Sequence, residues 1–228
     1  MMIILQKCKT GILQITYICF DKSESNHMSH PNIILLPLQS EDREQFILDN
    51  QWAFKYGAQL EFGMRDERCK EGEEVISRKT IEESIDGENA ETYRIVLEGK
   101  KVGGVVLRID KEAAKGELEL LFVHPEVHSK GIGQAAWKAV EAMHPEINVW
   151  ETITPYFEKR NIHFYVNRCG FHIVEFWNKY QHGPEVPDSE EENWSMDDEM
   201  FVFRKIILPK GGQPHRRPAP QESPAACR

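Results

Sequence analysis

Side chains that could do chemistry gather between residues 117 and 144, where two carboxylates precede two closely spaced glycines. Glu117 and Glu119 are separated by one residue, so a strand conformation predicts that they share one side with Leu121 and Val123. The residues expected on the other side are apolar: Leu118, Leu120 and Phe122. A carboxylate placed on a strand can accept a proton from a reacting group. An exposed carboxylate without a catalytic role is the alternative for both glutamates.

The second chemical feature is the sequence Gly131-Ile132-Gly133. Glycines leave room for an outside group to approach the backbone closely. The first amides of a helix have no partner inside the helix and lie at the positive end of its dipole, so they attract an anion. Lys130 adds a positive charge directly before them. The pattern predicts a phosphate site, and a tight turn before a packed helix is the alternative.

Other binding motifs are absent from the sequence. It contains neither the Gly-x-x-x-x-Gly-Lys-Ser/Thr run of nucleoside-triphosphate sites nor the three-glycine turn of dinucleotide sites. The nine histidines form no His-Glu-x-x-His pattern and the five cysteines form no Cys-x-x-Cys pair, so no metal site is expected. Unpaired cysteines in odd number are typical of reduced thiols, which predicts a cytoplasmic protein.

Hydrophobic spacing predicts the elements that position these residues. An apolar strand over residues 118–123 ends at His124-Pro125, and a helix begins at Gly131. That helix has one continuous apolar face, formed by Ile132, Ala135, Ala136, Ala139, Val140 and Met143. The other expected strands are 33–38, 92–97, 101–109, 147–151, 171–177 and 199–207, and the other expected helices are 41–54, 73–85 and 156–168.

Turn residues set the expected ends of these elements. Ser40 is predicted to cap the helix over 41–54, and Gly170 is predicted to end the helix over 156–168 in the left-handed conformation. Residues 98–100 are predicted to form a hairpin turn. Gly103 and Gly104 inside a strand indicate a bend or a close approach of another group. A flexible, aromatic-rich segment is expected over residues 52–62, and a polar loop over 181–198.

The segment VHPEVHSKGIGQAA resembles the acetyl-coenzyme A motif of the GNAT N-acetyltransferase superfamily, Gln/Arg-x-x-Gly-x-Gly/Ala after a strand that ends in Val-x-Pro. It keeps both glycines but has His128 in place of the first Gln or Arg, which weakens the side-chain part of pyrophosphate binding. The segment NIHFYVNRCGF, residues 161–171, is similar to the second landmark of the family, a helix with Asn and Phe-Tyr that exits through Gly-Phe. The resemblance covers roughly residues 33 to 207.

The resemblance implies an α/β fold of the α+β type. Its central sheet is expected to be mixed, largely antiparallel, with about six to seven strands and flanking helices. The expected organisation is a leader or disordered extension over residues 1–30, the acetyltransferase domain over 31–209 and a disordered tail over 210–228. Met28 stands just before the family-like opening, so a translation start there is the second interpretation of the first 27 residues.

The resemblance also implies roles for individual residues. Glu117 occupies the position of the strand glutamate of many family members, which makes it the expected general base. Tyr165 matches a tyrosine that often protonates the departing thiolate in the family, although half-buried packing is its alternative role. Asn161 matches the residue that hydrogen-bonds the pantetheine arm. The expected cofactor-binding residues are Leu121, Phe122, Val123, His128, Ser129, Lys130, Gly131, Ile132, Gly133, Gln134 and Asn161.

The reaction implied is acetyl transfer from acetyl-coenzyme A, as co-substrate, to a primary amine by direct attack in a ternary complex. An alkylammonium with a pKa of about 10.4 is only ~0.04% neutral at pH 7, so a base that removes its proton is needed. The early helical region forms one wall of the acceptor pocket in the family, and core packing is the alternative for its aromatic residues. The candidates here are Asp49, Trp52, Phe54, Tyr56, Glu61 and Phe62. Cys169 lacks the signature of a nucleophile and is expected to pack.

Charge and hydropathy limit the partners. The formal net charge of −9 argues against a nucleic-acid-binding surface and suits a cationic acceptor, although solubility explains the charge equally well. No run of about 18 apolar residues is present, so no membrane span is expected. Dimerisation is common in the family, so a homodimer is possible, but the sequence shows no interface signature.

Two alternative functions are considered. One is a non-catalytic coenzyme A sensor or scaffold with the same fold, and the other is an unrelated phosphate-binding module.

Overall fold

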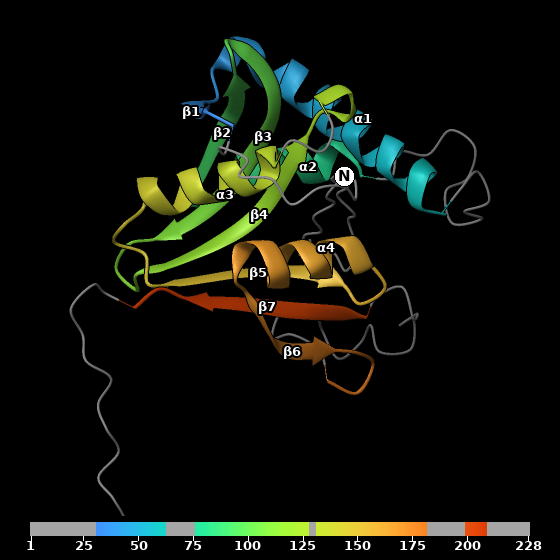
Figure 1. Ribbon diagram of the computed structural model, residues 1–228, viewed down its shortest axis with the longest axis vertical. Helices are drawn as coiled ribbons and strands as arrows, with labels where there is room; N and C mark the ends of the chain where they lie inside the picture. Colours follow the sequence, from blue (N-terminus) through green and yellow to red (C-terminus); the bar gives the residue numbers. More distant parts are fainter. Residues whose placement is uncertain (1–30, 63–75, 128–130, 182–198, 209–228) are drawn as a thin grey trace, which may run out of the picture.

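The structure is a computed structural model that describes residues 31–62, 76–127, 131–181 and 199–208 (Figure 1). Its strands form one seven-stranded sheet in the order β1-β2-β3-β4-β5-β7-β6. The strands are β1 (Ile33–Pro37), β2 (Ala90–Leu97), β3 (Lys100–Asp110), β4 (Lys115–Val123), β5 (Val149–Pro155), β6 (His172–Trp177) and β7 (Met200–Ile206). Neighbours β4 and β5 run parallel and the other neighbouring pairs run antiparallel, which confirms the predicted mixed sheet.

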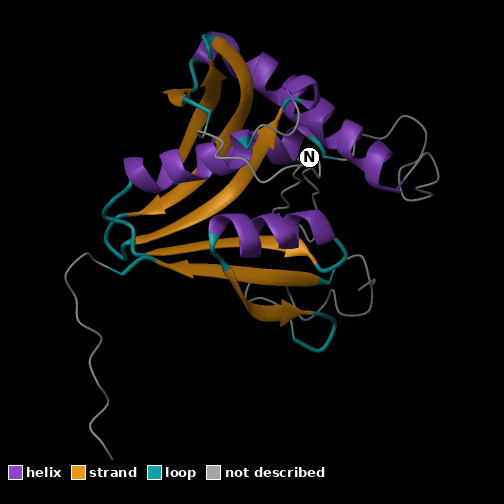
Figure 2. Cartoon of the chain, viewed as in Figure 1, coloured by secondary structure: helices purple, strands orange, loops and turns teal. Residues whose placement is uncertain are grey.

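Helices cover both faces of this sheet (Figure 2). The α-helices are α1 (Arg43–Phe62), α2 (Arg78–Ile85), α3 (Ile132–Met143) and α4 (Lys159–His163). The short helical turns are η1 (Ser40–Asp42) and η3 (Pro125–Val127), and the π-helical segment η4 (Phe164–Cys169) continues α4. Figure 1 shows α3 and α4 in front of the sheet, and α1 and α2 pack on its far face. None of the helices described here is long and apolar enough to cross a membrane.

Each face of the sheet has its own hydrophobic core. On the face of α3, the rings of Trp137 and Trp150 meet edge to face with centroids 5.1 Å apart. On the face of α1, Phe46 and Phe122 meet edge to face at the same centroid distance of 5.1 Å. Both cores contact β4, so every residue from Leu118 to Val123 is buried. This explains why β4 is apolar almost throughout.

A β-bulge in β4 changes which side chains share a face. Leu120 pairs with Val106 and Leu118 pairs with Leu107, so Glu119 is an extra residue between them. Leu118 therefore lies in the core under α3 together with Leu121 and Val123, whereas Leu120 and Phe122 lie in the core under α1. The prediction that Leu118 shares a side with Leu120 and Phe122 is wrong, because strict alternation holds only in a strand without an inserted residue.

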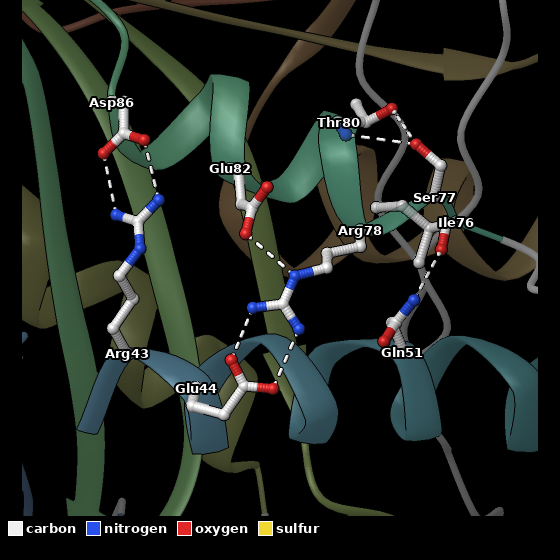
Figure 3. Close-up of polar contacts among 9 residues, drawn as sticks. All are labelled: Arg43, Glu44, Gln51, Ile76, Ser77, Arg78, Thr80, Glu82 and Asp86. Atoms are coloured by element: carbon white, nitrogen blue, oxygen red, sulfur yellow. Dashed lines mark hydrogen bonds and ion pairs between the residues drawn. The ribbon is translucent and has the colours of Figure 1, made fainter. Parts of the chain in front are cut away.

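Polar contacts hold α2 against α1 (Figure 3). Both guanidinium Nη atoms of Arg43 donate to the carboxylate of Asp86 at 2.7 Å. Arg78 binds Glu44 with both of its Nη atoms and donates through Nε to Glu82 at 2.9 Å. These contacts join α2 to the first turn of α1, the helix that faces the C-terminal half of β4.

The predicted turns at glycines agree with the structure. Residues 98 and 99 join β2 to β3 with positive φ values of 50° at Glu98 and 77° at Gly99. Gly103 and Gly104 permit close packing, because a Cβ atom at Gly104 would lie 2.2 Å from the Phe46 ring and one at Gly103 would lie 2.2 Å from the Phe122 carbonyl oxygen. Gly170 ends η4 with a φ of 78°.

Several predicted limits differ from the structure. Ser40 begins η1 rather than capping α1, and Gln39, the residue before it, makes no side-chain cap. Helix α1 continues through Gly57 to Phe62, where a flexible segment was expected, since an isolated glycine weakens a helix without ending it. The predicted helix over 156–168 begins only at Lys159 and widens into a π-helix at Phe164. The predicted leader over 1–30, the tail over 210–228 and most of the loop over 181–198 lie outside the described residues.

Candidate active site

The sheet opens between β4 and β5. These parallel strands pair at Lys115↔Val149, Gly116↔Trp150 and Glu117↔Glu151, and they diverge beyond that point (Figure 1). We call the region between Leu118–Val123 and Thr152–Pro155 the split, with its closed end at Glu117 and its open end at Val123. No described strand pairs with β4 along this edge. Backbone N–H and C=O groups along this edge therefore lack a strand partner among the described residues, and buried backbone groups need hydrogen-bond partners.

Buried polar side chains from β5 and α4 line the split. Thr152, Thr154 and Asn161 are fully buried. The Thr152 hydroxyl donates to the carbonyl oxygen of Leu118 at 3.0 Å, which satisfies one β4 group directly beyond the last paired residue. Asn161 donates through Nδ2 to the Thr154 hydroxyl at 3.1 Å. The predicted pantetheine-binding amide is therefore positioned at the split by a hydrogen bond to β5.

Tyr165 lies at the closed end of the split. Its ring packs between Phe171 and Phe203, with centroid distances of 5.6 and 5.2 Å. Its hydroxyl lies close to Thr152 but makes no well-formed hydrogen bond to the described residues. Burial raises the pKa of Tyr165 well above its usual value, while the neighbouring Thr152 lowers it by less. The phenol is thus protonated at neutral pH, as a proton donor must be.

The two glutamates of β4 have different surroundings. Glu119, in the bulge, is fully buried and forms an ion pair with Arg108. Glu117 is half-buried and lies in register with Arg108 on one side and with Glu151 on the other. Glu151 itself is bound by Lys115 and Arg204. Glu119 is therefore held by Arg108, and Glu117 marks the closed end of the split.

The N-terminus of α3 lies beyond the open end of β4. Gly131 precedes the helix with a φ of 72°, a left-handed conformation that favours glycine. The first helical bond runs from the N–H of Ala135 to the carbonyl of Gly131 at 2.9 Å, so the amides of Ile132, Gly133 and Gln134 precede the helical ladder. The Gln134 side chain donates to the Arg168 carbonyl at 2.7 Å, which ties the first turn of α3 to η4. The predicted ligands His128, Ser129 and Lys130 lie outside the described residues.

Cys169 is buried near Tyr165, in the core under α3 and η4. Burial raises the pKa of its thiol far above the usual range, so the thiol stays protonated. The side chain packs, as predicted.

Sequence reasoning missed three residues near the split. Thr152 and Thr154 alternate along β5, and this polar alternation in a buried strand was their available signal. His124 directly follows β4, and its Nε2 atom lies 3.2 Å from Oδ2 of Asp49 in α1. Among the predicted pocket residues, Asp49 and Trp52 contact His124, whereas Phe54 is buried in the core under α1. Nothing in the sequence joins residues 49 and 124, since the contact depends on how α1 crosses the sheet.

Comparison with known proteins agrees with this arrangement. Residues 60–171 match the model of the acetyltransferase (GNAT) family. The chain is also 42% identical over 185 residues to the uncharacterized protein YrkN of Bacillus subtilis (strain 168), a match that covers 80% of this chain and 97% of the relative. The chain belongs to the GNAT acetyltransferase family. It is an N-acetyltransferase by class.

Solved structures share the fold. The PaiA N-acetyltransferase from Thermoplasma acidophilum, in complex with coenzyme A, superposes with a TM-score of 0.53 at 17% identity, covering 77% of this chain and 99% of that one. The ribosomal-protein-S18-alanine N-acetyltransferase from Escherichia coli superposes with a TM-score of 0.52 at 11% identity, covering 80% and 99%. Both matches support the predicted sheet with its flanking helices.

Proposed function

We propose that this protein transfers an acetyl group from acetyl-coenzyme A to a primary amine of a small molecule or a peptide, by direct attack in a ternary complex. The observation that supports this most strongly is the split itself. It combines an unpaired β4 edge, a buried tyrosine at its closed end and the N-terminus of α3 beyond its open end. A linear cofactor with a diphosphate at one end and a thioester at the other fits this order of groups.

The diphosphate binds at the open end in this proposal. The amides of Ile132, Gly133 and Gln134 donate to its oxygens. The pantetheine arm then follows β4, where the backbone groups of Leu121, Phe122 and Val123 pair with its amides. Asn161 hydrogen-bonds the same arm from the α4 side.

The thioester lies along β4 within the split, with Glu117 and Tyr165 toward its closed end. The amine attacks the thioester carbonyl carbon, and the bond from carbon to sulfur breaks as the tetrahedral intermediate collapses. Glu117, acting through water, accepts the proton that the nitrogen loses as the amide forms. Tyr165, whose buried phenol is protonated, donates a proton to the sulfur as the thiolate departs. The proton on Glu117 returns to Tyr165 before the next turnover.

The test is turnover of a panel of amines, followed as thiol release from acetyl-coenzyme A. The panel contains a polyamine, free amino acids and short peptides with a free N-terminus, the last because the E. coli neighbour acts on an alanine of a ribosomal protein. We expect at least one class to be acetylated. Glu117→Gln should lower kcat by about 10²-fold or more, whereas Glu112→Gln, an exposed residue of the β3–β4 turn, should not.

A melting-temperature measurement with coenzyme A separates the alternatives. If coenzyme A raises Tm but no amine is acetylated, the protein is a sensor or scaffold. If coenzyme A leaves Tm unchanged, the turn at Gly131 binds a different anion and the proposal is wrong.

A further inference from the structure

Three side chains from two elements meet at the open end of the split, on the face of α1. His124 follows β4, while Asp49 and Trp52 come from the middle of α1. The Nε2 atom of His124 lies 3.2 Å from Oδ2 of Asp49, and the Trp52 ring meets the imidazole edge-on with centroids 5.4 Å apart. The His124 side chain is 20% exposed and Trp52 is 39% exposed, so solutes reach the imidazole.

Asp49 is held as a carboxylate by several donors. Gln45 donates to its Oδ1 and Arg94 donates to its Oδ2, both at 2.7 Å. Burial works against the charge, but the hydrogen bonds from His124, Gln45 and Arg94 outweigh it and lower the pKa of Asp49. Arg94 is itself buried and also donates to Asp42. Asp49 is therefore ionised and fixed in place at neutral pH.

The position of His124 is fixed in the same way. Its backbone N–H donates to the Val102 carbonyl at 2.7 Å, and its ring stacks beside Phe122 at 6.5 Å. Because Nε2 faces a carboxylate, the neutral imidazole carries its proton on Nε2 and its lone pair on Nδ1. No described residue donates a hydrogen bond to Nδ1. A base supported by a carboxylate thus stands where an acceptor from the α1 side meets the split.

We propose, on the basis of the function above, that His124 is the catalytic base that deprotonates the incoming substrate ammonium, with Asp49 as its positioning residue. Two protons leave the nitrogen in the reaction. His124 Nδ1 takes the first one from the ammonium and makes the amine nucleophilic, and it later releases this proton to solvent. The second proton, lost as the amide forms, goes to Glu117 and replaces the one that Tyr165 gives to the thiolate. The net products are the amide, coenzyme A as a thiol and one proton.

The neighbours of His124 suit this role. The charged groups that the described residues place around it are Asp49 of α1 and Arg94 of β2, with Asp42 and Lys101 behind them and Glu126 exposed on η3. Asp49 is the one in contact with the imidazole, and it stabilises the imidazolium once formed. The Trp52 ring beside the imidazole offers an aromatic face to an approaching ammonium.

The test compares kcat/KM against pH for the wild type and His124→Gln, with an alkylamine from the panel. We expect the variant to lose about 10²-fold or more near pH 7. The loss should shrink steadily as the pH approaches the pKa of the amine, about 10, because the substrate then arrives neutral. Asp49→Asn should show the same pH-dependent pattern with a smaller loss. His172→Gln, on the exposed strand β6, should match the wild type at every pH.

Two kinetic results would overturn the inference. One is a His124→Gln profile that superposes on the wild type, and the other is an equal loss at every pH, which indicates a structural role. ¹⁵N NMR of the wild-type imidazole gives a check that needs no variant: the neutral ring is expected in the Nε2–H form, and the Nδ1–H form contradicts the proposal. If the wild type binds coenzyme A but acetylates no amine, the proposed function itself has failed, and the base has no reaction to serve.

Discussion

Tyr165 reaches the closed end of the split from a position without solvent access. Its burial and its aromatic neighbours keep the phenol protonated, so the loss of its hydroxyl should affect proton donation rather than cofactor binding. We expect Tyr165→Phe to lower kcat by roughly 10²–10⁴-fold with little change in coenzyme A affinity. Steady-state kinetics and a binding titration measure the two effects separately, and a change in kcat under threefold would remove Tyr165 from this role.

Gly131 offers a second prediction at the scale of one residue. A side chain there is strained, because φ is 72°, and the strain falls on the loop proposed to hold the diphosphate. Gly131→Ala should cost about 1–2 kcal/mol of stability and should raise the KM for acetyl-coenzyme A more than it lowers kcat.

Gly99→Ala is the matched control for this change. Gly99 has nearly the same φ, 77°, and open space around it, but it lies in the hairpin between β2 and β3. The Gly99→Ala variant should lose about as much stability as Gly131→Ala, without a change in the KM for acetyl-coenzyme A. If the two variants have equal KM values for acetyl-coenzyme A, the turn at Gly131 takes no part in cofactor binding.

At the scale of the elements, one buried ionic network joins η1, α1 and β2. Arg94 binds both Asp42 and Asp49, and the Lys101 ammonium also pairs with the Asp42 carboxylate. Burial raises the pKa of Asp42, but the hydrogen bonds from Arg94 and Lys101 outweigh it, so the net pKa is lowered. A carboxyl group whose pKa is lower in the folded state stabilises the fold above its unfolded pKa, and this contribution is lost as the pH falls through the folded pKa.

The free energy of unfolding should therefore change little between pH 7 and about 5 and should fall below about pH 4. Urea unfolding at several pH values measures this. The fall should be shallower in Asp42→Asn, which removes one of the shifted groups, and unchanged in Glu112→Gln. Parallel curves for Asp42→Asn and the wild type would show that this network does not cause the acid sensitivity.

The elements also show where local sequence predicts structure and where it does not. The hairpin at Glu98-Gly99 and the end of η4 at Gly170 were predictable, because their backbone conformations favour particular residues. The bulge at Glu119 was not, since it depends on pairing with β3 rather than on β4 itself. The π-helical segment lacked a local signal as well, because Tyr165 is held there by rings from Phe171 and the distant β7.

At the scale of the whole molecule, the sheet consists of two parts joined by a three-residue parallel ladder and by the connection through α3. The order of elements and the motif at Gly131 allowed this architecture to be predicted from the sequence. The neighbourhood of His124 and Asp49 could not be predicted, because it arises only where α1 crosses the end of β4. The parts of the candidate site that the motifs did not predict thus depend on contacts between residues that are distant in sequence.

The split gives this single sheet four edges instead of two. The outer edges, on β1 and β6, are each bordered by one strand, and such edges can pair with a strand of another chain. The inner edges, on β4 and β5, converge at the paired residues Glu117 and Glu151, so a strand that pairs with one inner edge approaches the other. In the proposed function the co-substrate occupies the β4 edge, which is thereby withheld from strands of other chains.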